Sequence, residues 1–185
     1  ITWLIFNESW GVRGIRTDEE QQSFVNGLYY LTKSFDSMRP VIGNDGWEQV
    51  LTDIVSIHNY EQEGDRLFDA YADRQRALAQ DTANLVQHPA FAEGYQDNGL
   101  PVILSEFGGC GFPSSGENSF VYSASATEEE YYTRFNLLTD AVKRLDYLSG
   151  YCYTQFSDVE QEKNGLVTMD RHFKVDPIRI RAINE

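Results

Sequence analysis

The sequence predicts an α/β fold built on a parallel sheet, and two observations carry that prediction. Short apolar runs alternate with amphipathic helical patterns along the chain, and two of these runs, residues 3–6 and 101–105, lead into glutamates in glycine-containing segments. Runs of four to five apolar residues bounded by turn formers are typical of buried parallel strands. Strands that alternate with helices indicate right-handed crossovers within one sheet.

The first half of the chain predicts three strands and two helices. Residues 17–20 (Thr-Asp-Glu-Glu) have the pattern of a capping box and start a helix. Strands are expected at residues 3–6, 40–43 and 53–57, with one helical turn at 47–51. A long helix should begin at residue 64 and end before Pro89. The apolar face of the first helix is expected to consist of Phe24, Leu28, Leu31 and Phe35.

The second half predicts two further strands, at residues 101–105 and 150–156, separated by a glycine- and serine-rich loop and a helix. Thr127 starts that helix with a second capping box. A short extended piece is expected at residues 165–170, and Pro177 should start a terminal helix. The face of the central helix that should pack inward consists of Tyr131, Phe135, Leu138, Val142 and Leu145.

Composition limits the classes of partner. The chain has 185 residues, of which 41% are hydrophobic and 14% aromatic. Such a chain is suited to a globular core and is too apolar for disorder. A net charge of −14 argues against nucleic acid or an anionic membrane as partner. No apolar stretch approaches the roughly 20 residues of a membrane span. Because the chain opens inside a predicted strand and without Met, we expect it to be a segment of a longer protein; the compartment stays open.

Two glutamates, Glu8 and Glu106, follow closely on predicted strands. In barrels and open α/β sheets, carboxylates at the carboxyl ends of parallel strands point into the mouth where active sites lie. Two carboxylates in such a mouth are what glycoside hydrolysis requires. One is protonated and gives its proton to the leaving oxygen, and the other is ionised and meets the oxocarbenium-like centre.

Four motifs occur in order along nearly the whole chain: Asn-Glu-Ser-Trp-Gly at residues 7–11, Ile-His-Asn-Tyr at 57–60, Leu-Ser-Glu-Phe-Gly at 104–108, and residues 151–166. Together they resemble glycoside hydrolase family two, the β-galactosidase, β-glucuronidase and β-mannosidase type. The resemblance implies a TIM barrel in which the Asn-Glu strand is the fourth and the Ser-Glu strand the seventh. Five predicted strands are too few for a barrel of eight strands and about 250 residues.

Residues 1–185 are therefore expected to form a single segment, the C-terminal portion of the catalytic barrel with strands four to eight. A self-contained flavodoxin-like sheet is the structural alternative, but its ligand site does not explain two glutamates at strand ends. Open strand edges predict that the isolated segment pairs with a second copy or covers these edges.

The resemblance implies a role for several residues. It makes Glu8 the general acid/base and Glu106 the nucleophile of a retaining mechanism with a covalent glycosyl-enzyme. Asn7 would bind the sugar 2-hydroxyl, and Tyr60 would donate a hydrogen bond to the nucleophile. Turn formation by Asn7, and packing of Tyr60 in the core or at the rim, are the alternatives.

Aromatic residues and the residues beside Tyr60 are weaker candidates for sugar binding. Trp10 and Trp47 could pack against pyranose rings, and Tyr153 lies near the position where related barrel enzymes place a tryptophan platform; for each, a packing role is the alternative. His58 and Asn59 lie on alternating strand faces, so one of them should reach the pocket.

The substrate is expected to be a neutral β-glycoside, with a β-galactoside favoured. Glucuronidases of the family carry Asn-x-Lys just before a matching glycine, whereas Glu162 and Asn164 occupy those positions here and Lys163 falls between them. The acidic balance of the chain also argues against a uronic acid. The alternative function is a catalytically silent barrel fragment that acts only as a carbohydrate-binding or structural unit.

No cofactor and no metal site are predicted. The three histidines of the chain lack ligand spacing, and Cys110 and Cys152 form no metal or redox pattern. Cys152 lies in a predicted core strand and should be a buried thiol, and a disulfide between the two cysteines is left open.

Overall fold

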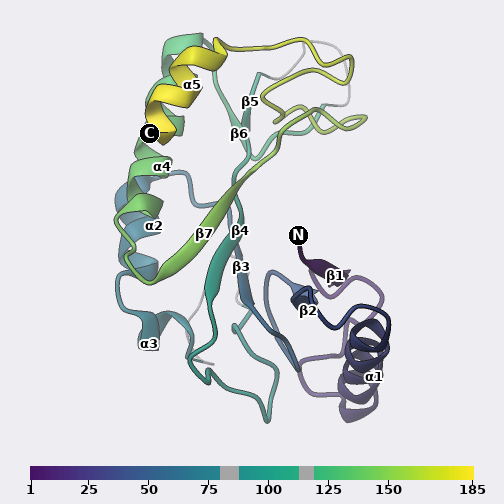
Figure 1. Cartoon of the computed structure of the whole chain (residues 1–185). Coiled ribbons are helices and arrows are strands. Elements are labelled where there is room, and N and C mark those ends of the chain that lie inside the picture. The colour runs from purple at the N-terminus through teal and green to yellow at the C-terminus, as the bar shows by residue number, and fades with distance from the viewer. Residues whose placement is uncertain (80–87, 113–118) are drawn as a thin grey trace. The chain divides into compact units, whose positions relative to one another are not determined.

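The computed structural model describes residues 1–79, 88–112 and 119–185. Strands and helices alternate along much of the chain, as the sequence predicts (Figure 1). The strands are β1 (Trp3–Asn7), β2 (Val41–Asp45), β3 (Val55–Asn59), β4 (Val102–Gly108), β5 (Cys110–Gly111), β6 (Ser123–Ala124) and β7 (Leu148–Thr154). The helices are α1 (Glu19–Phe35), α2 (Gly64–Tyr71), α3 (Arg74–Ala77), α4 (Glu128–Lys143) and α5 (Pro177–Asn184).

The strands form three sheets in the described part of the chain. β1 and β2 pair in parallel, with Trp3 opposite Val41 and Asn7 opposite Asp45. β3, β4 and β7 form a three-stranded sheet in that order, and β5 pairs in parallel with β6. The mixed α/β architecture with parallel pairing is the predicted one. The described strands do not close a barrel, so the complete barrel stays an expectation.

The chain divides into two compact units. Unit 1 consists of residues 1–58, 70–105 and 147–151, and unit 2 of residues 59–69, 106–146 and 152–185. The strands β3, β4 and β7 each contribute their first residues to unit 1 and their last residues to unit 2. Each unit is described by itself below.

In unit 1, α1 packs on β1 and β2 (Figure 1). Its N-cap is Asp18, one residue later than the start of the predicted capping box, and the carboxylate accepts the Glu20 and Gln21 backbone N–H groups. The predicted apolar face is wrong, because Gln22 and Val25 are the buried residues of the helix. Phe24, Leu31 and Phe35 are between 52% and 86% exposed.

The helix α1 buries a different face from the predicted one because of a set of polar contacts that periodicity does not reveal. The Gln22 amide donates to the carbonyl of Ile15, and the Tyr29 hydroxyl donates to the Asp53 carboxylate. Burial and the charge of Asp53 raise the pKa of Tyr29, so the phenol remains a donor. The apolar contacts of this face belong to a small core cluster of Val12, Ile15, Val25, Val50 and Ala92.

Two helical predictions in the first half of the chain are wrong. Residues 47–51 form no helical turn; Gln49 instead makes a parallel bridge to Phe91. The long helix after residue 64 is interrupted, because α2 ends at Tyr71 and Asp73 caps a new short helix by accepting the Arg76 N–H. The last residues predicted for that helix, including Leu85 and Val86, lie outside the described residues.

In unit 2, the prediction for α4 is confirmed. Thr127 caps the helix by accepting the Glu130 N–H, and Glu130 accepts the N–H of Ala126 in return. α5 packs against α4 and begins with Pro177 after the N-cap Asp176 (Figure 1). The predicted inward residues of α4 and of the turn after it are all buried: Tyr131, Phe135, Leu138, Val142 and Leu145.

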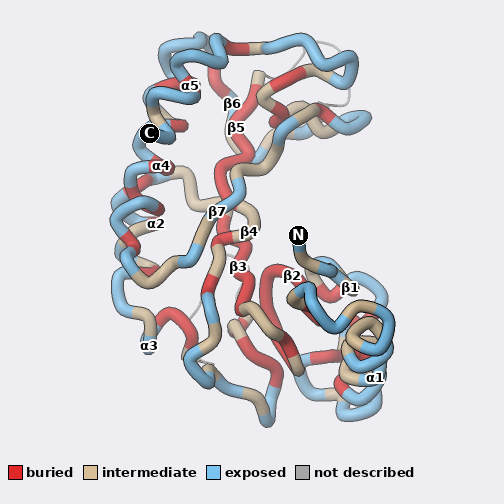
Figure 2. The backbone as a smooth tube through the Cα atoms, in the orientation of Figure 1, coloured by how far each residue is buried: buried red, intermediate tan, exposed pale blue. Residues whose placement is uncertain are grey.

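Burial differs sharply among the strands (Figure 2). All residues of β2 and β3 are buried, whereas β7, an edge strand of its sheet, keeps most residues partly or fully exposed. The prediction that Cys152 is buried is therefore wrong, because it lies on this exposed edge strand. Cys110 is buried, and no disulfide joins the two described cysteines.

Candidate active site

Glu8 lies in a tight turn directly after β1, in unit 1. The Trp10 N–H donates to the Asn7 carbonyl at 2.9 Å, and the Glu8 N–H donates to the Asp45 carbonyl at 2.9 Å. Glu8 and Ser9 have φ values of 51° and 59°. These values lie in the left-handed region that side-chain-bearing residues rarely adopt. Such backbone conformations persist where surrounding contacts enforce them, and they are frequent at functional sites.

The Glu8 carboxylate meets His58, which is only 2% exposed. His58 Nδ1 lies 2.9 Å from Glu8 Oε1, and Nε2 lies 3.3 Å from Asp45 Oδ2. Burial raises the pKa of Asp45, but hydrogen bonds from His58, Ser56 and Ser105 outweigh it and hold that pKa below its ordinary value. An imidazole between two carboxylates can donate to both only when both of its nitrogens carry protons.

The loop after β2 encloses His58. Gly46 has a φ of 103°, and a Cβ at this position would lie 2.8 Å from His58 Nδ1. Both the backbone conformation and the available space therefore require glycine. Trp47 is 6% exposed; its ring stacks on His88 at 4.6 Å and meets His58 edge-on at 5.8 Å. Trp47 therefore lies within the packing of unit 1.

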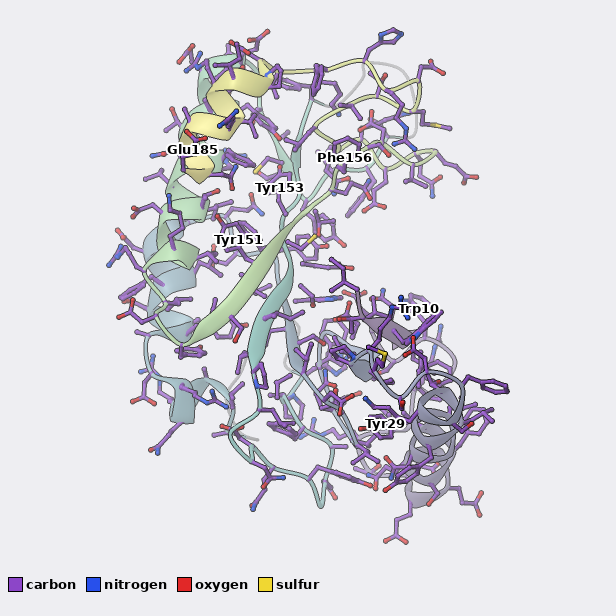
Figure 3. The ribbon with its side chains drawn as sticks, in the orientation of Figure 1. Trp10, Tyr29, Tyr151, Tyr153, Phe156 and Glu185 are labelled. Atoms are coloured by element: carbon purple, nitrogen blue, oxygen red, sulfur yellow. The ribbon has the colours of Figure 1, made fainter. Side chains whose placement is uncertain are left out.

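Trp10 differs from Trp47 in exposure. Its side chain extends from the turn after β1 (Figure 3). The side chain is 61% exposed. The Arg13 guanidinium lies 4.8 Å from the centroid of its ring. Asn7 is exposed as well, and its carbonyl closes the turn that carries Glu8. An exposed indole beside an exposed amide has the chemistry to contact a sugar.

Glu106 lies within β4 near its C-terminal end, in unit 2. The Tyr60 hydroxyl donates to Glu106 Oε2 at 2.5 Å. Burial and the neighbouring charge of Glu106 raise the pKa of Tyr60 far above its ordinary value, so the phenol keeps its proton and remains a donor. The Tyr122 ring stacks face to face on the Tyr60 ring, with centroids 3.5 Å apart.

The glycines after Glu106 allow aromatic rings to approach the backbone. Gly108 and Gly109 have φ values of 91° and 66°. A Cβ at Gly108 would lie 2.2 Å from the Tyr153 ring, and a Cβ at Gly109 would lie 2.5 Å from the Tyr122 ring. The Gln62 amide donates to the carbonyl of Gly108 at 2.8 Å. These contacts fix the chain that leaves the Glu106 strand.

Tyr153 (labelled in Figure 3) belongs to an aromatic cluster with Phe107 and Phe135. Its hydroxyl accepts the Cys110 N–H at 3.1 Å, and burial raises its pKa. Burial likewise raises the pKa of the Cys110 thiol to about 11, so this thiol is a weak nucleophile near neutral pH. Asn59 is buried, and its side-chain oxygen accepts the N–H of Glu61.

Within each unit, the structure brings predicted site residues together. Glu8 and His58 are in contact in unit 1, and Tyr60 and Glu106 are in contact in unit 2. The sequence predictions missed Asp45 and Tyr122. Asp45 follows an apolar strand as Glu8 does, so a signal was available, but Asn-Asp-Gly at residues 44–46 is also typical of a turn. Tyr122 lies in a loop without periodicity, so no sequence signal marks it.

A membrane-crossing helix is not found: none of the helices in the described ranges is both long and apolar enough. No family model and no curated protein matches the sequence.

Solved structures do match. A β-glucuronidase from Ruminococcus gnavus in complex with N1-substituted uronic isofagomine gives a TM-score of 0.65 at 16% identity, over 100% of this chain and 32% of its own. A GH2 β-galacturonidase from Eisenbergiella tayi bound to galacturonate gives 0.63 at 20% identity, over 99% and 32%. An uncultured Clostridium sp. β-glucuronidase gives 0.60 at 19% identity, over 100% and 31%.

The chain thus spans about a third of the length of these solved structures. At such identities the likeness shows the fold alone: the chain is folded like about a third of these glycosidase structures. The likeness to a family-two fold that the four motifs predict is supported at this level, and the C-terminal part of a TIM barrel stays an expectation.

Proposed function

We propose that this chain carries the catalytic carboxylates of a retaining β-glycosidase, with Glu106 as nucleophile and Glu8 as general acid/base. The observation that carries the proposal is the Tyr60 hydroxyl donating to the carboxylate of Glu106. The likeness of the fold to part of glycoside hydrolases that act on uronides supports it. In the retaining mechanism, the two carboxyl groups stand about 5–5.5 Å apart.

The chemistry follows from what each carboxyl can do. The Glu106 carboxylate attacks the anomeric carbon and forms the glycosyl-enzyme, while Glu8 gives its proton to the departing glycosidic oxygen. Glu8 then takes a proton from the water that attacks the anomeric carbon and frees Glu106. The high pKa of Tyr60 suits this role, because a phenol that keeps its proton stabilises an ionised carboxylate throughout the cycle.

Substrate contacts are proposed for the exposed residues near Glu8. Asn7 would bind the sugar 2-hydroxyl, a contact that strengthens in the transition state. Trp10, with most of its side chain exposed, is the better placed of the two tryptophans for a sugar platform. Trp47, His58, Asn59 and Tyr153 would shape the site by packing and hydrogen bonding rather than by sugar stacking.

For the substrate, we propose a neutral β-glycoside such as a β-galactoside. Asn164, in the segment where glucuronidases grip the carboxylate, is fully buried, and its side-chain oxygen accepts from Gln155 at 2.8 Å. Lys174 is bound to Asp158 at 2.7 Å and to the Lys163 carbonyl. A uronide is the second candidate, because the solved structures are named for glucuronides and galacturonide.

Labelling with a 2-fluoro glycoside followed by mass spectrometry tests the mechanism, in the chain and in the longest natural polypeptide that contains it. The probe should remain attached to Glu106; attachment to another residue would refute the nucleophile assignment. Hydrolysis of nitrophenyl β-galactoside, β-glucuronide and β-galacturonide ranks the substrates. Sugar binding without labelling or hydrolysis in both polypeptides would instead support a silent carbohydrate-binding unit.

A further inference from the structure

Glu48 is a buried carboxylate that the proposed mechanism does not use. It is 3% exposed and has a φ of 50°, in unit 1. Its Oε2 accepts the hydroxyl of Ser9 at 2.7 Å, and its Oε1 lies 2.7 Å from His88 Nδ1. A buried carboxylate is costly unless hydrogen bonds compensate it. Both oxygens of Glu48 have such partners.

The other contacts of Ser9 complete a closed network. Its backbone N–H donates to Asn44 Oδ1 at 2.9 Å, and its hydroxyl accepts from Asn44 Nδ2 at 3.0 Å. The same Asn44 amide donates to the carbonyl of Trp47 at 2.8 Å. The Ser9 hydroxyl thus accepts from Asn44 and donates to Glu48, and its orientation is fully determined.

This network holds the turn that presents Glu8. Glu8 and Ser9 both occupy the left-handed region, where a Cβ crowds the following carbonyl oxygen and makes the conformation unfavourable. Local bonds from two directions, Asn44 on β2 and Glu48 in the following loop, offset that cost. Ser9 follows Glu8 directly in the chain, so bonds that hold Ser9 also restrain the backbone of Glu8, whose carboxylate lies 2.9 Å from His58 Nδ1.

We infer that Glu48 and Ser9 are positioning residues for the general acid/base Glu8. The inference rests on the proposed function, since it assigns these residues to the proton transfer of that mechanism. Glu48 also anchors the loop whose Trp47 ring packs on His58. The network therefore reaches Glu8 in two ways. One is through Ser9, its neighbour in the chain, and the other is through His58, on which Trp47 packs.

The leaving-group dependence of kcat/KM tests the inference, because this ratio reports glycosylation alone. Glu48→Ala and Ser9→Ala should each lower kcat/KM about 10–100-fold for alkyl glycosides, since misplacing a catalytic group by about 1 Å can cost on the order of 10²-fold. For dinitrophenyl glycosides, whose leaving group departs without protonation, kcat/KM should fall less than about threefold.

Three further variants sharpen this test. Glu48→Gln keeps an acceptor for the Ser9 hydroxyl and should retain most activity. The double variant with both alanines should lose little more than either single one, because both changes break one network. Ser34→Ala is the matched control; this exposed serine on α1 bonds only to the carbonyl of Leu31 among the hydrogen bonds seen and should change nothing.

An equal loss for alkyl and dinitrophenyl glycosides, or no loss in Ser9→Ala, would overturn the inference. Should Glu48→Ala fail to fold, Ser9→Ala decides alone.

A readout that needs no turnover is the 15N spectrum of the His58 imidazole in the 185-residue chain. Ser9→Ala should change its Nδ1 signal and Ser34→Ala should not. An unchanged signal would refute the positioning role even if labelling at Glu106 succeeds, and absent labelling with a changed signal would refute the proposed function instead.

Discussion

The two glutamates share one sequence signal but have different surroundings. Glu8 lies in a left-handed turn of unit 1, held by polar side chains, and its carboxylate meets an imidazole. Glu106 lies in a regular strand, and its carboxylate meets a phenol that is stacked on a second aromatic ring. The position of a glutamate after an apolar run therefore does not predict which side chains its carboxylate contacts.

The difference fits the proposed division of roles. An acid/base must change protonation in each cycle, and an imidazole can gain or lose a proton near neutral pH. A nucleophile must stay ionised, and Tyr60 donates a hydrogen bond without releasing its proton because burial and the Glu106 charge raise its pKa. The partner of each carboxylate thus suits the task assigned to it.

The largest effect should follow removal of the nucleophile. Glu106→Gly should lower hydrolysis by on the order of 10⁴-fold or more, because the covalent step no longer has an attacking atom. The variant should still transfer sugar from a glycosyl fluoride of inverted anomeric configuration to an acceptor, which product analysis detects. Retained hydrolysis would show that another residue attacks the sugar.

Removal of the acid/base should have a smaller and selective effect. Glu8→Ala should slow poor leaving groups about 10²–10⁴-fold and flatten the alkaline limb of the pH–rate profile. Azide should restore turnover of activated substrates and yield a glycosyl azide. If azide has no effect and the alkaline limb is unchanged, another group supplies the proton.

Loss of the phenol donor should cost less again. Tyr60→Phe keeps the ring stacked on Tyr122 but removes the hydrogen bond to Glu106. The change should lower kcat about 10²-fold, the low end for one preorganised donor. Steady-state kinetics measure the change. Tyr122→Phe is the control that keeps the stack and the donor. Equal losses in both variants would mean that the loss in Tyr60→Phe does not come from the missing hydrogen bond to Glu106.

The smallest effect concerns stability in unit 1. The folded pKa of Asp45 is lowered from its ordinary value of 3.8. Its contribution to stability is therefore present above that ordinary value and is lost as pH falls through the folded value. Asp45→Asn should reduce the free energy of unfolding by about 1.5–3 kcal/mol at pH 7 and by less near pH 3.

Urea denaturation of the chain at the two pH values measures this difference. The exposed Asp140 lies 3.8 Å from Arg144 and provides the control variant Asp140→Asn. Because an exposed ion pair contributes little, this control should change stability by only about 0.5 kcal/mol or less at both pH values. A loss for Asp45→Asn that is equal at pH 7 and pH 3 would show that its charge does not support the fold.

The two long helices show how far periodicity predicts packing. In α4 all of the predicted inward residues are buried, and the additional buried residues, Tyr132, Thr139 and Ala141, widen this face without displacing it. In α1 the aromatic stripe competes with Gln22 and Tyr29, which bond to groups on other segments, and the polar-containing face is buried instead. A hydrophobic count cannot weigh such bonds, because their acceptors lie elsewhere in the chain.

Local chemistry let the sequence by itself determine the alternating architecture, the capped start of α4, the start of α5 at Pro177 and, within one residue, the capped start of α1. It also determined the placement of both glutamates near strand ends. Caps and apolar runs act over a few residues, so they can be read without neighbours. Only the tertiary structure decided which side chains meet the glutamates. His58 lies 50 residues from Glu8, Tyr60 lies 46 from Glu106, and Glu48 lies 39 from Ser9. Parallel pairing of β1 with β2 brings the turn of Glu8 and Ser9 to the end of β2, and the pairing of β3 with β4 brings the strand ends before Tyr60 and at Glu106 together. That register is a property of the assembled sheets.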